Sequence, residues 1–565
     1  MWFLLFGELF GFTEILGTAI NTFQTIALFT TYSLGRMFAA MLVSLVLALS
    51  YGIAAAKYKR AQKVMIPLLD ILQSVPILGF FPVAIFLLIA ILGETGLGVE
   101  VAAIFLIVTS MAWNMIFAVY ESMLTLPREV NEVSSAFNLR GWRKFRRVFF
   151  PATIPKLVFN MILSWSNGWY FLVAAEIISV GTQSYTLPGL GSFLATSTYS
   201  GDFAGAFFGI IVLILIIFAT DLLIWRPIEA LSARYKFDPA PIELATPSGI
   251  FNVSRISGRL VRFPIPKGTS PLIHWIRHII TGTLQFMSRV IDELHSKVIG
   301  GRYWIFKDIG RGVGLLFLAL ILYSLFTIVF TGRQNIFQSI SGLLTDPNLM
   351  EKVYQIPIST ISSLGRLGVA LLISLAWTSV VAVKIARGGR RFAVAMPIFQ
   401  TAAAIPPTAF FPFIVVLFID IPGGLELAAI LLTITGMQWY LLFNLIAGVR
   451  SIPSDVNEVA RSVKLQGIGY WKKVLLPSMY PSLVTGSITA WGGGWNALIL
   501  AEFVIVGGKT FSVLGLGALI NIAAYEIGDV SLLLLIVFSM VVTIVVIDRF
   551  FWRRLYAKVE EWSKT

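Results

Sequence analysis

Long apolar runs separated by short polar or basic turns make up most of this chain. The runs lie near 32–56, 77–93, 99–121, 156–180 and 203–225, and they return near 362–386, 407–422, 425–448, 482–506 and 529–551. About 20 apolar residues cross a bilayer as a helix. The pattern therefore predicts an all-α polytopic membrane protein with two units of five spans each.

The two sets of runs are homologous repeats in the same chain order. Positions that recur 330 residues later include Gly35, Arg36, Pro67, Pro76 and Pro82. After a four-residue contraction, positions that recur 326 residues later include Trp113, Pro127, Glu132, Gly141, Pro151, Trp165, Trp169, Glu176 and Gly189. This period is too long for a solenoid. It predicts duplicated domains, which we place at 1–226 and 308–565.

Basic residues set the predicted orientation, because cytoplasmic loops are enriched in Lys and Arg. The run KYKR at 57–60, the loop 140–147 and Arg226 alternate with uncharged or acidic turns such as 93–100. Each five-span unit then enters from outside and ends inside, so two parallel units require one more crossing. We assign it to the apolar residues 313–330, which gives about 11 transmembrane helices.

The first residues and the join are expected to lie outside the bilayer core. Residues 2–16 contain Glu8 and Glu14, which favours an interfacial helix, with a span as the alternative. They also lack the basic start and small-residue cleavage site of a secretory signal. Residues 227–307 form a basic cytoplasmic linker, in which 271–298 has the periodicity of an amphipathic helix on the inner leaflet.

A metal site in the linker is the weaker of two interpretations. His274 and His278 are four residues apart and can share a helix face, but no carboxylate stands near them at ligand spacing. We therefore interpret both as part of a polar helix face and predict no metal site.

Composition agrees with a membrane location. The chain of 565 residues is 57% hydrophobic and only 13% charged, whereas about a quarter of the residues of a soluble domain are charged. The absence of cysteine excludes disulfides, thiolate metal sites and a cysteine nucleophile. The net charge of +14 comes from short basic clusters beside apolar runs, which favours an anionic membrane surface over nucleic acid.

One polar, basic segment occurs twice, as LPREVNEVSSAFNLRGWRKFRRVFFPATIP at 126–155 and as IPSDVNEVARSVKLQGIGYWKKVLLPSMYP at 452–481. Glu132, Val133 and Ala136 lie at helical spacing, which predicts a short helix parallel to the membrane with a small-residue face that another protein can approach. An ordinary positive-inside loop explains the basic residues, but not why the polar pattern was retained twice. We therefore predict two equivalent docking surfaces.

The segment resembles the EAA loop of permease subunits of bacterial and archaeal ATP-binding-cassette importers. That loop carries Glu-Ala-Ala, then a glycine, then an aliphatic residue before Leu-Pro, with Glu and Pro nineteen residues apart. Glu132 and Pro151 have this separation, and so do Glu458 and Pro477.

The match is not complete, because Glu-Val-Ser and Glu-Val-Ala replace Glu-Ala-Ala. Asn138 and Lys464 occupy the glycine position, with Gly141 and Gly467 three residues later. We therefore expect the turn of each loop to be shifted.

The proline-rich helix starts and the Trp-x3-Trp-x6-Glu segments are similar to the nitrate, sulfonate and taurine branch of these MetI-like, binding-protein-dependent permeases. The resemblance implies two cytoplasmic ATPase subunits, an extracytoplasmic substrate-binding protein and a small anionic or polar solute such as nitrate, a sulfonate or bicarbonate. It implies a multi-pass protein of the cell inner membrane, with loops, linker and C-terminus in the cytoplasm. The residues expected to couple to the ATPases are Glu132, Val133, Ala136, Arg140, Gly141, Glu458, Val459, Ala460, Gln466 and Gly467.

ATP hydrolysis is assigned to separate subunits. A phosphate-binding loop requires Gly-x4-Gly-Lys-Ser/Thr, and the nearest match, Gly507-Gly508-Lys509-Thr510, has Phe503 in place of the first glycine. We expect a transport subunit that is not an enzyme and that binds no cofactor, with ATP and magnesium in the partner ATPase.

Polar residues inside spans mark either a path or a buried contact. Glu176 and Glu502 fit both interpretations, as path residues or as structural locks near the outer end. The tryptophans Trp165, Trp169, Trp491 and Trp495, together with Asn167 and Asn496, can line a path of aromatic and amide groups, although tryptophan in membranes is more often interfacial or packed. Arg36 and Arg366 fit either attraction of an anion or anchoring by snorkelling.

Two other classes of protein compete with this interpretation. A secondary transporter built of parallel repeats requires a charged ion relay, for which the spans offer little besides Glu176 and Glu502. A membrane-embedded enzyme is disfavoured because the sequence places no cluster of His, Asp and Glu at one membrane depth.

The predicted crossing at 313–330 can be tested in this cysteine-free chain. Ser248→Cys is expected to react with an impermeant thiol reagent from the cytoplasmic side, and Asn335→Cys from the outside. Labelling of both positions from one side would remove the linking span and the parallel arrangement of the halves.

Overall fold

The computed structural model describes residues 12–232, 235 and 345–564, apart from short gaps at 75, 93–95, 127, 140, 181–182, 389–394, 451, 453 and 507–508. The predicted amphipathic helix with His274 and His278, nearly all of the linker and the span 313–330 lie outside these residues. Seven helices of the described part are long and apolar enough to cross a membrane. The prediction of an all-α polytopic membrane protein is confirmed.

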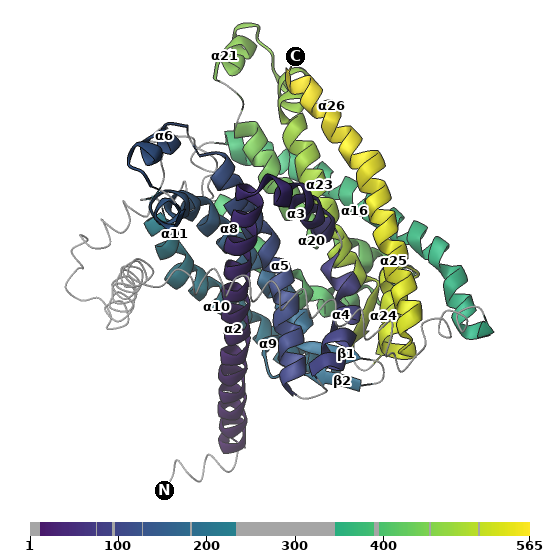
Figure 1. Ribbon diagram of the computed structural model, residues 1–565. Coiled ribbons are helices and arrows are strands. Elements are labelled where there is room, and N and C mark those ends of the chain that lie inside the picture. The colour runs from purple at the N-terminus through teal and green to yellow at the C-terminus, as the bar shows by residue number, and fades with distance from the viewer. Residues whose placement is uncertain are drawn as a thin grey trace, which may run out of the picture.

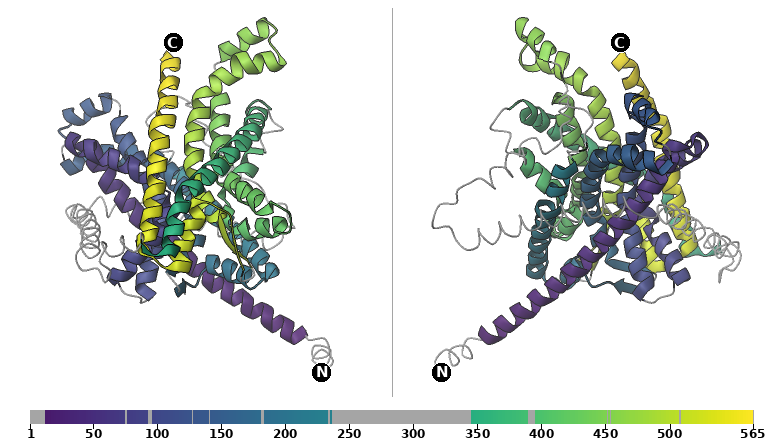
Figure 2. Two further views of the ribbon diagram at one scale, coloured as in Figure 1. Left: turned by 90° about the vertical axis from the view of Figure 1, so that its right-hand side faces the viewer. Right: turned by 60° about the vertical axis from the view of Figure 1, so that its left-hand side comes forward.

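The first half begins with α2 (Phe12–Lys57), α3 (Lys59–Ser74), α4 (Ile77–Leu92) and α5 (Gly96–Leu124). The 46 residues of α2 correspond to about 69 Å of helix. Residues 12–16, part of the expected interfacial segment, are continuous with the first span, and the start of α2 projects beyond the body of the molecule (Figures 1 and 2). Residues 2–11 lie outside the described part.

The rest of the first half comprises α6 (Arg128–Ala136), α7 (Gly141–Lys144), α8 (Phe150–Ala175), β1 (Ile177–Val180), β2 (Gln183–Thr186), α9 (Leu190–Tyr199), α10 (Phe203–Thr220) and α11 (Arg226–Ser232). Strands β1 and β2 form an antiparallel hairpin in which Ile177 pairs with Thr186. The hairpin returns the chain so that α9 packs against both α2 and α8.

The second half repeats this order. Its elements are α16 (Pro347–Arg387), α18 (Ala395–Ala404), η6 (Pro407–Phe410), α19 (Phe411–Phe418), α20 (Gly424–Arg450), α21 (Ser454–Ser462), α22 (Gly467–Tyr470), α23 (Leu476–Ala501), β3 (Phe503–Val506), β4 (Lys509–Ser512), α24 (Leu516–Asn521), α25 (Val530–Ile547) and α26 (Arg553–Lys564). The repeat extends to backbone detail, because the π-helical turns Phe145–Phe149 and Asp221–Trp225 return as Trp471–Leu475 and Asp548–Trp552.

The runs expected near 77–93 and 407–422 form shorter helices. Helix α4 has 16 residues, about 24 Å, which is less than the ~30 Å hydrocarbon core. In the second half the same run is divided into η6 and α19, each with a proline in its first turn. Proline is best tolerated in the first turn of a helix, and Pro407 and Pro412 occupy that turn in η6 and α19. One long helix was expected here, and α4 does continue through the equivalent Pro82.

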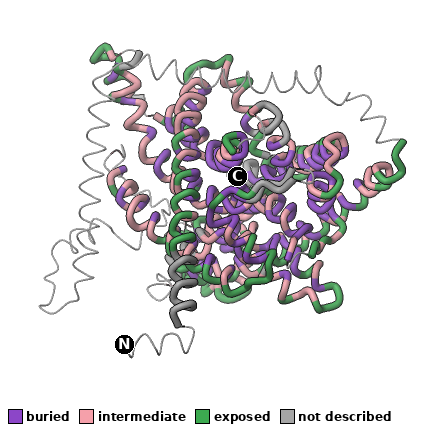
Figure 3. Tube along the Cα trace, turned by 90° about the horizontal axis from the view of Figure 1, so that it is seen from below, coloured by how far each residue is buried: buried purple, intermediate pink, exposed green. Residues whose placement is uncertain are grey.

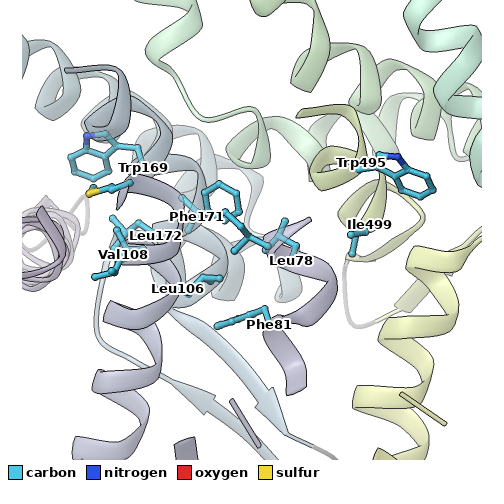
Figure 4. Close-up of a cluster of buried hydrophobic side chains, with 14 of the residues drawn as sticks. Leu78, Phe81, Leu106, Val108, Trp169, Phe171, Leu172, Trp495 and Ile499 are labelled. Atoms are coloured by element: carbon cyan, nitrogen blue, oxygen red, sulfur yellow. The ribbon is translucent and has the colours of Figure 1, made fainter. Parts of the chain in front are cut away.

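These short helices join the two halves. Helix α4 packs against α23 and α25 of the second half, and η6 packs against α8 of the first. Figure 4 shows Leu78 and Phe81 of α4 between Phe171 of α8 and Ile499 of α23. All four side chains belong to one buried apolar cluster that contains residues of both halves. The halves therefore share a single core.

The molecule has two distinct ends. Helices α6, α21 and the C-terminal α26 lie at one end, and the hairpin β1–β2 with α9 and α24 lies at the other (Figure 1). Seen from the hairpin end, buried residues gather in the middle and exposed ones along the outer helices (Figure 3). Large apolar side chains on those outer helices are more than half exposed, among them Leu42, Phe207, Leu372 and Phe538, as expected of a surface that faces lipid.

Candidate functional site

The duplicated loop forms a short helix in each half, α6 and α21, at the same end of the molecule (Figure 1). The Glu-Val pair of each helix is exposed, and these residues are Glu132 and Val133 in α6, and Glu458 and Val459 in α21. Val133 is 56% exposed and Val459 is 63% exposed. Four of the residues predicted to couple thus lie on the outer surface of the loops.

The small residue that follows each valine points inward. Ser134 in α6 and its equivalent Ala460 in α21 are both buried. Ala460 packs in a cluster with Tyr470 and Val474 of its own half, whereas Ala136 is exposed. Ala136 is therefore accessible to a partner, whereas Ala460 packs beneath the loop and stabilises it.

Each loop helix ends in the same tight turn. Asn138 and Lys464 have φ of 50° and 52°, in the left-handed region that usually requires glycine. The amides of Leu139 and Leu465 donate to the carbonyls of Ser134 and Ala460, each at 2.9 Å. This six-to-one bond defines a Schellman cap.

The expectation of a shifted turn is therefore wrong. The turn lies at the glycine position of the EAA pattern, at Asn138 and Lys464, although neither residue is glycine. The main-chain hydrogen bonds of the cap hold the left-handed conformation in place of a glycine.

The remaining predicted coupling residues lie beyond the turn. Gly141 begins α7, and Gln466 and Gly467 are exposed at the start of α22. Arg140 lies outside the described residues.

Exposed apolar side chains beside the turns were not predicted. Phe137 is 75% exposed in the first loop, and Val463 and Ile468 are 66% and 74% exposed in the second. Phe137 and Val463 are equivalent positions of the repeat. The signal in the sequence was an apolar residue kept at one position of an otherwise polar loop.

At the other end, Glu176 is held by a complete set of donors. It is fully buried. Its Oε1 accepts from the Ser33 hydroxyl at 2.5 Å and from Arg36 Nη1 at 2.8 Å, and its Oε2 accepts from the Gly191 amide at 2.6 Å. The Ser33 hydroxyl also accepts from the Leu190 amide at 2.9 Å. The carboxylate therefore joins α2 and α8 to the start of α9.

Arg36 completes the network. Its Nε and Nη2 donate to the two oxygens of Glu100 in α5 at 2.7 and 2.6 Å, and its Nη1 also donates to the Pro188 carbonyl at 2.9 Å. Arg36 is only 3% exposed, so it neither snorkels to an interface nor faces a free anion. Paired, bidentate arginine is the form in which a buried charge is tolerated.

The second half builds the same network from equivalent residues. Arg366 donates to Glu426 at 2.6 and 2.7 Å and to Glu502 at 2.7 Å. Glu502 is fully buried and also accepts from Ser363 at 2.7 Å and from the Gly517 amide at 2.7 Å. Both glutamates thus have the contacts of a structural lock, and their role as path residues stays a prediction.

Glycine makes the close approach of the carboxylate possible. A Cβ at Gly189 would meet the Glu176 carboxyl carbon at 2.2 Å, and a Cβ at Gly515 would meet that of Glu502 at 2.1 Å. No side chain fits at these distances. The glycines at 189 and 515, which the repeat retained, therefore belong to the lock.

The four tryptophans of the predicted path are packed against other side chains, and Trp165 and Trp491 pack within their own halves. Trp165 contacts Trp225 with ring centroids 5.3 Å apart, and the equivalent Trp491 contacts Trp552 at 5.6 Å. Trp169 and Trp495 are almost fully buried. These contacts fasten α8 and α23 to the last helix of each half, so they favour packing over contact with a solute.

Polar groups do meet where the halves join. The Tyr440 hydroxyl of α20 lies 3.5 Å from Asn167 Oδ1 of α8, and the Leu78 amide of α4 donates to Asn496 Oδ1 of α23 at 3.3 Å. Both asparagines of the predicted path therefore lie at the interface between halves. Among the described residues, no group of three His, Cys, Asp or Glu side chains is placed to hold a metal.

Comparison with known proteins agrees with this architecture. The model of the family described as "Binding-protein-dependent transport system inner membrane component" matches residues 48–225 and 374–555, more than half of the chain. The prediction of two fused permease domains of this family is confirmed.

Individual relatives match parts of the chain. A nitrate import permease protein of Leptolyngbya laminosa is 38% identical over 111 residues, which are 20% of this chain and 38% of that protein. A bicarbonate transport system permease protein of Synechococcus elongatus is 36% identical over 193 residues, 34% of this chain and 65% of that protein. A probable ABC transporter permease protein of Brucella melitensis is 24% identical over 148 residues, 26% of this chain and 56% of that protein. Each alignment spans less than two thirds of the relative.

The lock predicts a large loss of stability when one partner is removed. Glu176→Gln removes the buried carboxylate that accepts from Ser33, Arg36 and the Gly191 amide, while Arg36 keeps Glu100 as its other partner. We expect the free energy of unfolding to fall by about 3 kcal/mol, measured as a lower melting temperature. The matched control is Glu121→Gln, which removes an exposed pair with Lys156 and should cost at most about 1 kcal/mol. Equal shifts in the two variants would contradict the structural role.

Replacing the left-handed residue of each loop turn with glycine is expected to stabilise the protein. Lys464→Gly relieves a left-handed conformation that costs a non-glycine residue about 1–2 kcal/mol, offset in part by the greater flexibility of the unfolded chain. We expect a net gain of up to about 1 kcal/mol, and a smaller gain for Asn138→Gly, because asparagine tolerates this conformation. Thermal melting of the two variants tests this order, and a loss of stability for Lys464→Gly would contradict the assigned turn.

Proposed function

The chain belongs to the family of binding-protein-dependent transport system inner membrane components, and on this premise we propose that it is the permease of an ATP-driven importer of a small oxyanion. Two permease domains in one chain would form the whole translocation path. ATP and magnesium would bind to separate ATPase subunits, and this chain would not itself be an enzyme.

The observation that carries the proposal is the pair of exposed loop helices at one end. Helices α6 and α21 lie at one end of the molecule (Figure 1). Their equivalent glutamates and valines are exposed, and each helix is stabilised by the same cap. Two equivalent surfaces fit two copies of a partner. We propose that Glu132, Val133, Ala136, Glu458 and Val459 contact two cytoplasmic ATPase subunits, together with the segments that begin at Arg140 and Gln466.

The exposed apolar residues beside the turns give these surfaces their affinity. Phe137 and Val463 occupy equivalent places and are mostly exposed, which is unfavourable in water and favourable in a protein interface. A partner that buries them on both loops would gain hydrophobic energy at two points of one chain.

Orientation follows from the same assignment. The loops, the linker and the C-terminal α26 would face the cytoplasm, and the hairpins with α9 and α24 would face outward in the inner membrane. An extracytoplasmic substrate-binding protein would then dock at the hairpin end.

The locks suit a mechanism of rigid-body rocking. Each Arg–Glu network joins three helices of its half. These are α2, α5 and α8 in the first half, and α16, α20 and α23 in the second. Movement imposed on a coupling loop would then be carried by the half as a unit. The flexible boundary would be the contact between halves, where α4 meets α23 and α25, and η6 meets α8.

The substrate class comes from the relatives and from the charge of the interior. Two relatives are named as permeases for nitrate and for bicarbonate, both small oxyanions. The buried carboxylates of the described part, Glu176 and Glu502, are paired with arginine, so they do not present free negative charge that would repel an anion. Because both carboxylates are paired with arginine, neither is free to bind the proton or sodium ion that a secondary transporter would use.

Charge reversal on the loops tests coupling. In the double variant Glu132→Lys, Glu458→Lys, we expect ATP hydrolysis by the assembled complex to continue while uptake per ATP falls at least about tenfold, the effect of losing roughly 1.4 kcal/mol of coupling. The control is Glu351→Lys, an exposed glutamate of α16 away from both loops. Full uptake per ATP in the double variant, with normal insertion, would refute the assigned surfaces.

A further inference from the structure

Two buried hydroxyl groups at the interface between halves have no hydrogen-bond partner among the described residues. They are Tyr170 Oη in α8 and Thr408 Oγ1 in η6, and η6 packs against α8. An unpaired buried hydroxyl costs about 1–3 kcal/mol. Other buried hydroxyls of the described part also lack a partner, at Ser359, Ser374 and Ser487, but Tyr170 and Thr408 lie on packed elements that belong to opposite halves.

An amide completes the group. Asn167 lies one turn before Tyr170 on α8, and its Oδ1 faces the Tyr440 hydroxyl at 3.5 Å. Its Nδ2 donates no hydrogen bond within the described part of the chain. We call Asn167, Tyr170, Thr408 and Tyr440 the hydroxyl–amide cluster.

The repeat shows that this cluster is not a structural requirement of the fold. By the spacing of the repeat, Asn496 corresponds to Tyr170 and Leu78 corresponds to Thr408. There, Asn496 Oδ1 accepts from the Leu78 amide at 3.3 Å. On that side the Asn496 side chain is bonded to a main-chain amide. On the equivalent side, Tyr170 and Thr408 carry hydroxyls that have no partner among the described residues.

The other two positions of the cluster also differ between the halves. Gly493 replaces Asn167, and Asn114 replaces Tyr440. A Cβ at Gly493 would meet the Tyr440 ring at 2.7 Å, so the bare backbone provides the space for the phenol. The locks, the caps and the paired tryptophans are the same in both halves, whereas the polar residues at their interface are not.

We propose that the hydroxyl–amide cluster is an anion-binding site of the translocation path, placed to one side of the pseudo-twofold axis, and this rests on the proposed function. A solute that crosses between two similar halves contacts both of them, and a small solute cannot contact both equally unless it shares their symmetry. Selection for its binding therefore acts differently on equivalent positions, which accounts for the loss of the repeat at these four places.

The chemistry of the cluster favours an oxyanion. Tyr170 and Thr408 offer O–H donors, and Asn167 offers N–H donors while its carbonyl faces Tyr440. Nitrate has only acceptor oxygens, and bicarbonate has two besides its single O–H group, so either anion would accept hydrogen bonds from these donors. Lys156 is the sole ionised residue in the sequence of α8, and that of α23 has none. Neutral donors bind an anion weakly enough to release it, as conduction requires.

Removal of single hydroxyls tests the site by transport. Tyr170→Phe deletes the hydroxyl oxygen, and Thr408→Val replaces the hydroxyl with a methyl group. Each variant is assembled with its ATPases in proteoliposomes, and uptake of nitrate and of bicarbonate is measured. We expect kcat/KM for the transported anion to fall about tenfold per variant, with the melting temperature unchanged or raised because an unpaired group is lost. The control is Tyr51→Phe, whose hydroxyl donates to the Met65 carbonyl and whose loss should lower stability but not the uptake ratio of the two anions.

The outcomes separate the two proposals. Wild-type uptake that both variants retain would overturn the cluster and leave the permease assignment intact. ATP-driven uptake of a cation or a neutral solute alone would also overturn the cluster and leave an importer. Absence of ATP-driven uptake of every solute would overturn the proposed function itself.

A second measurement does not require the natural substrate. Tyr170→Cys in the cysteine-free chain is treated, during ATP turnover, with sulfonatoethyl or trimethylammonioethyl methanethiosulfonate, and each rate is divided by that of the exposed Tyr354→Cys. We expect the anionic reagent to be favoured about tenfold after this normalisation. Equal rates, preference for the cation or failure of both reagents to react would overturn the site.

Discussion

The buried ion pair between an arginine of the first long helix and a glutamate at the end of α8 or α23 is the constraint on which each half depends. Unpaired charge at this depth costs several kcal/mol, so every donor must be in place. Arg36 therefore requires Glu100 and Glu176 together, and Glu176 requires the amide of Gly191. Because these groups come from four elements, one electrostatic requirement sets how the helices of a half are held relative to one another.

Some features of the two halves are built from equivalent residues, and others differ between the halves. The two locks, the two caps of the loop helices and the paired tryptophans of each half are built from equivalent residues. They hold the helices of each half together by the same contacts. Where the units meet, Tyr170 and Asn496 differ although they occupy the same position of the repeat, which is the place where a single solute would pass.

Several features were predictable from local pattern, and others required residues distant in the chain. The loop helices follow from the spacing around Glu132 and Glu458, because helical periodicity is local. The position of the turn at Lys464 was predicted wrongly, because its left-handed conformation is held by main-chain hydrogen bonds that residue type does not reveal. The pairing of Arg36 with Glu176 does not follow from local pattern, because 140 positions separate two side chains that lie 2.8 Å apart.

By itself the sequence determined the class of protein, the duplication and the two exposed loops, because hydropathy, repeat spacing and helical periodicity are properties of short segments and of their order. Only the tertiary structure decided what the polar residues inside the membrane do. It paired Glu502 with Arg366, and it left the hydroxyls of Tyr170 and Thr408 without partners in the part of the chain that the structure describes. The physical reason is that the energy of a buried polar group is set by its neighbours in space, and those neighbours come from other helices and from the other half of the chain.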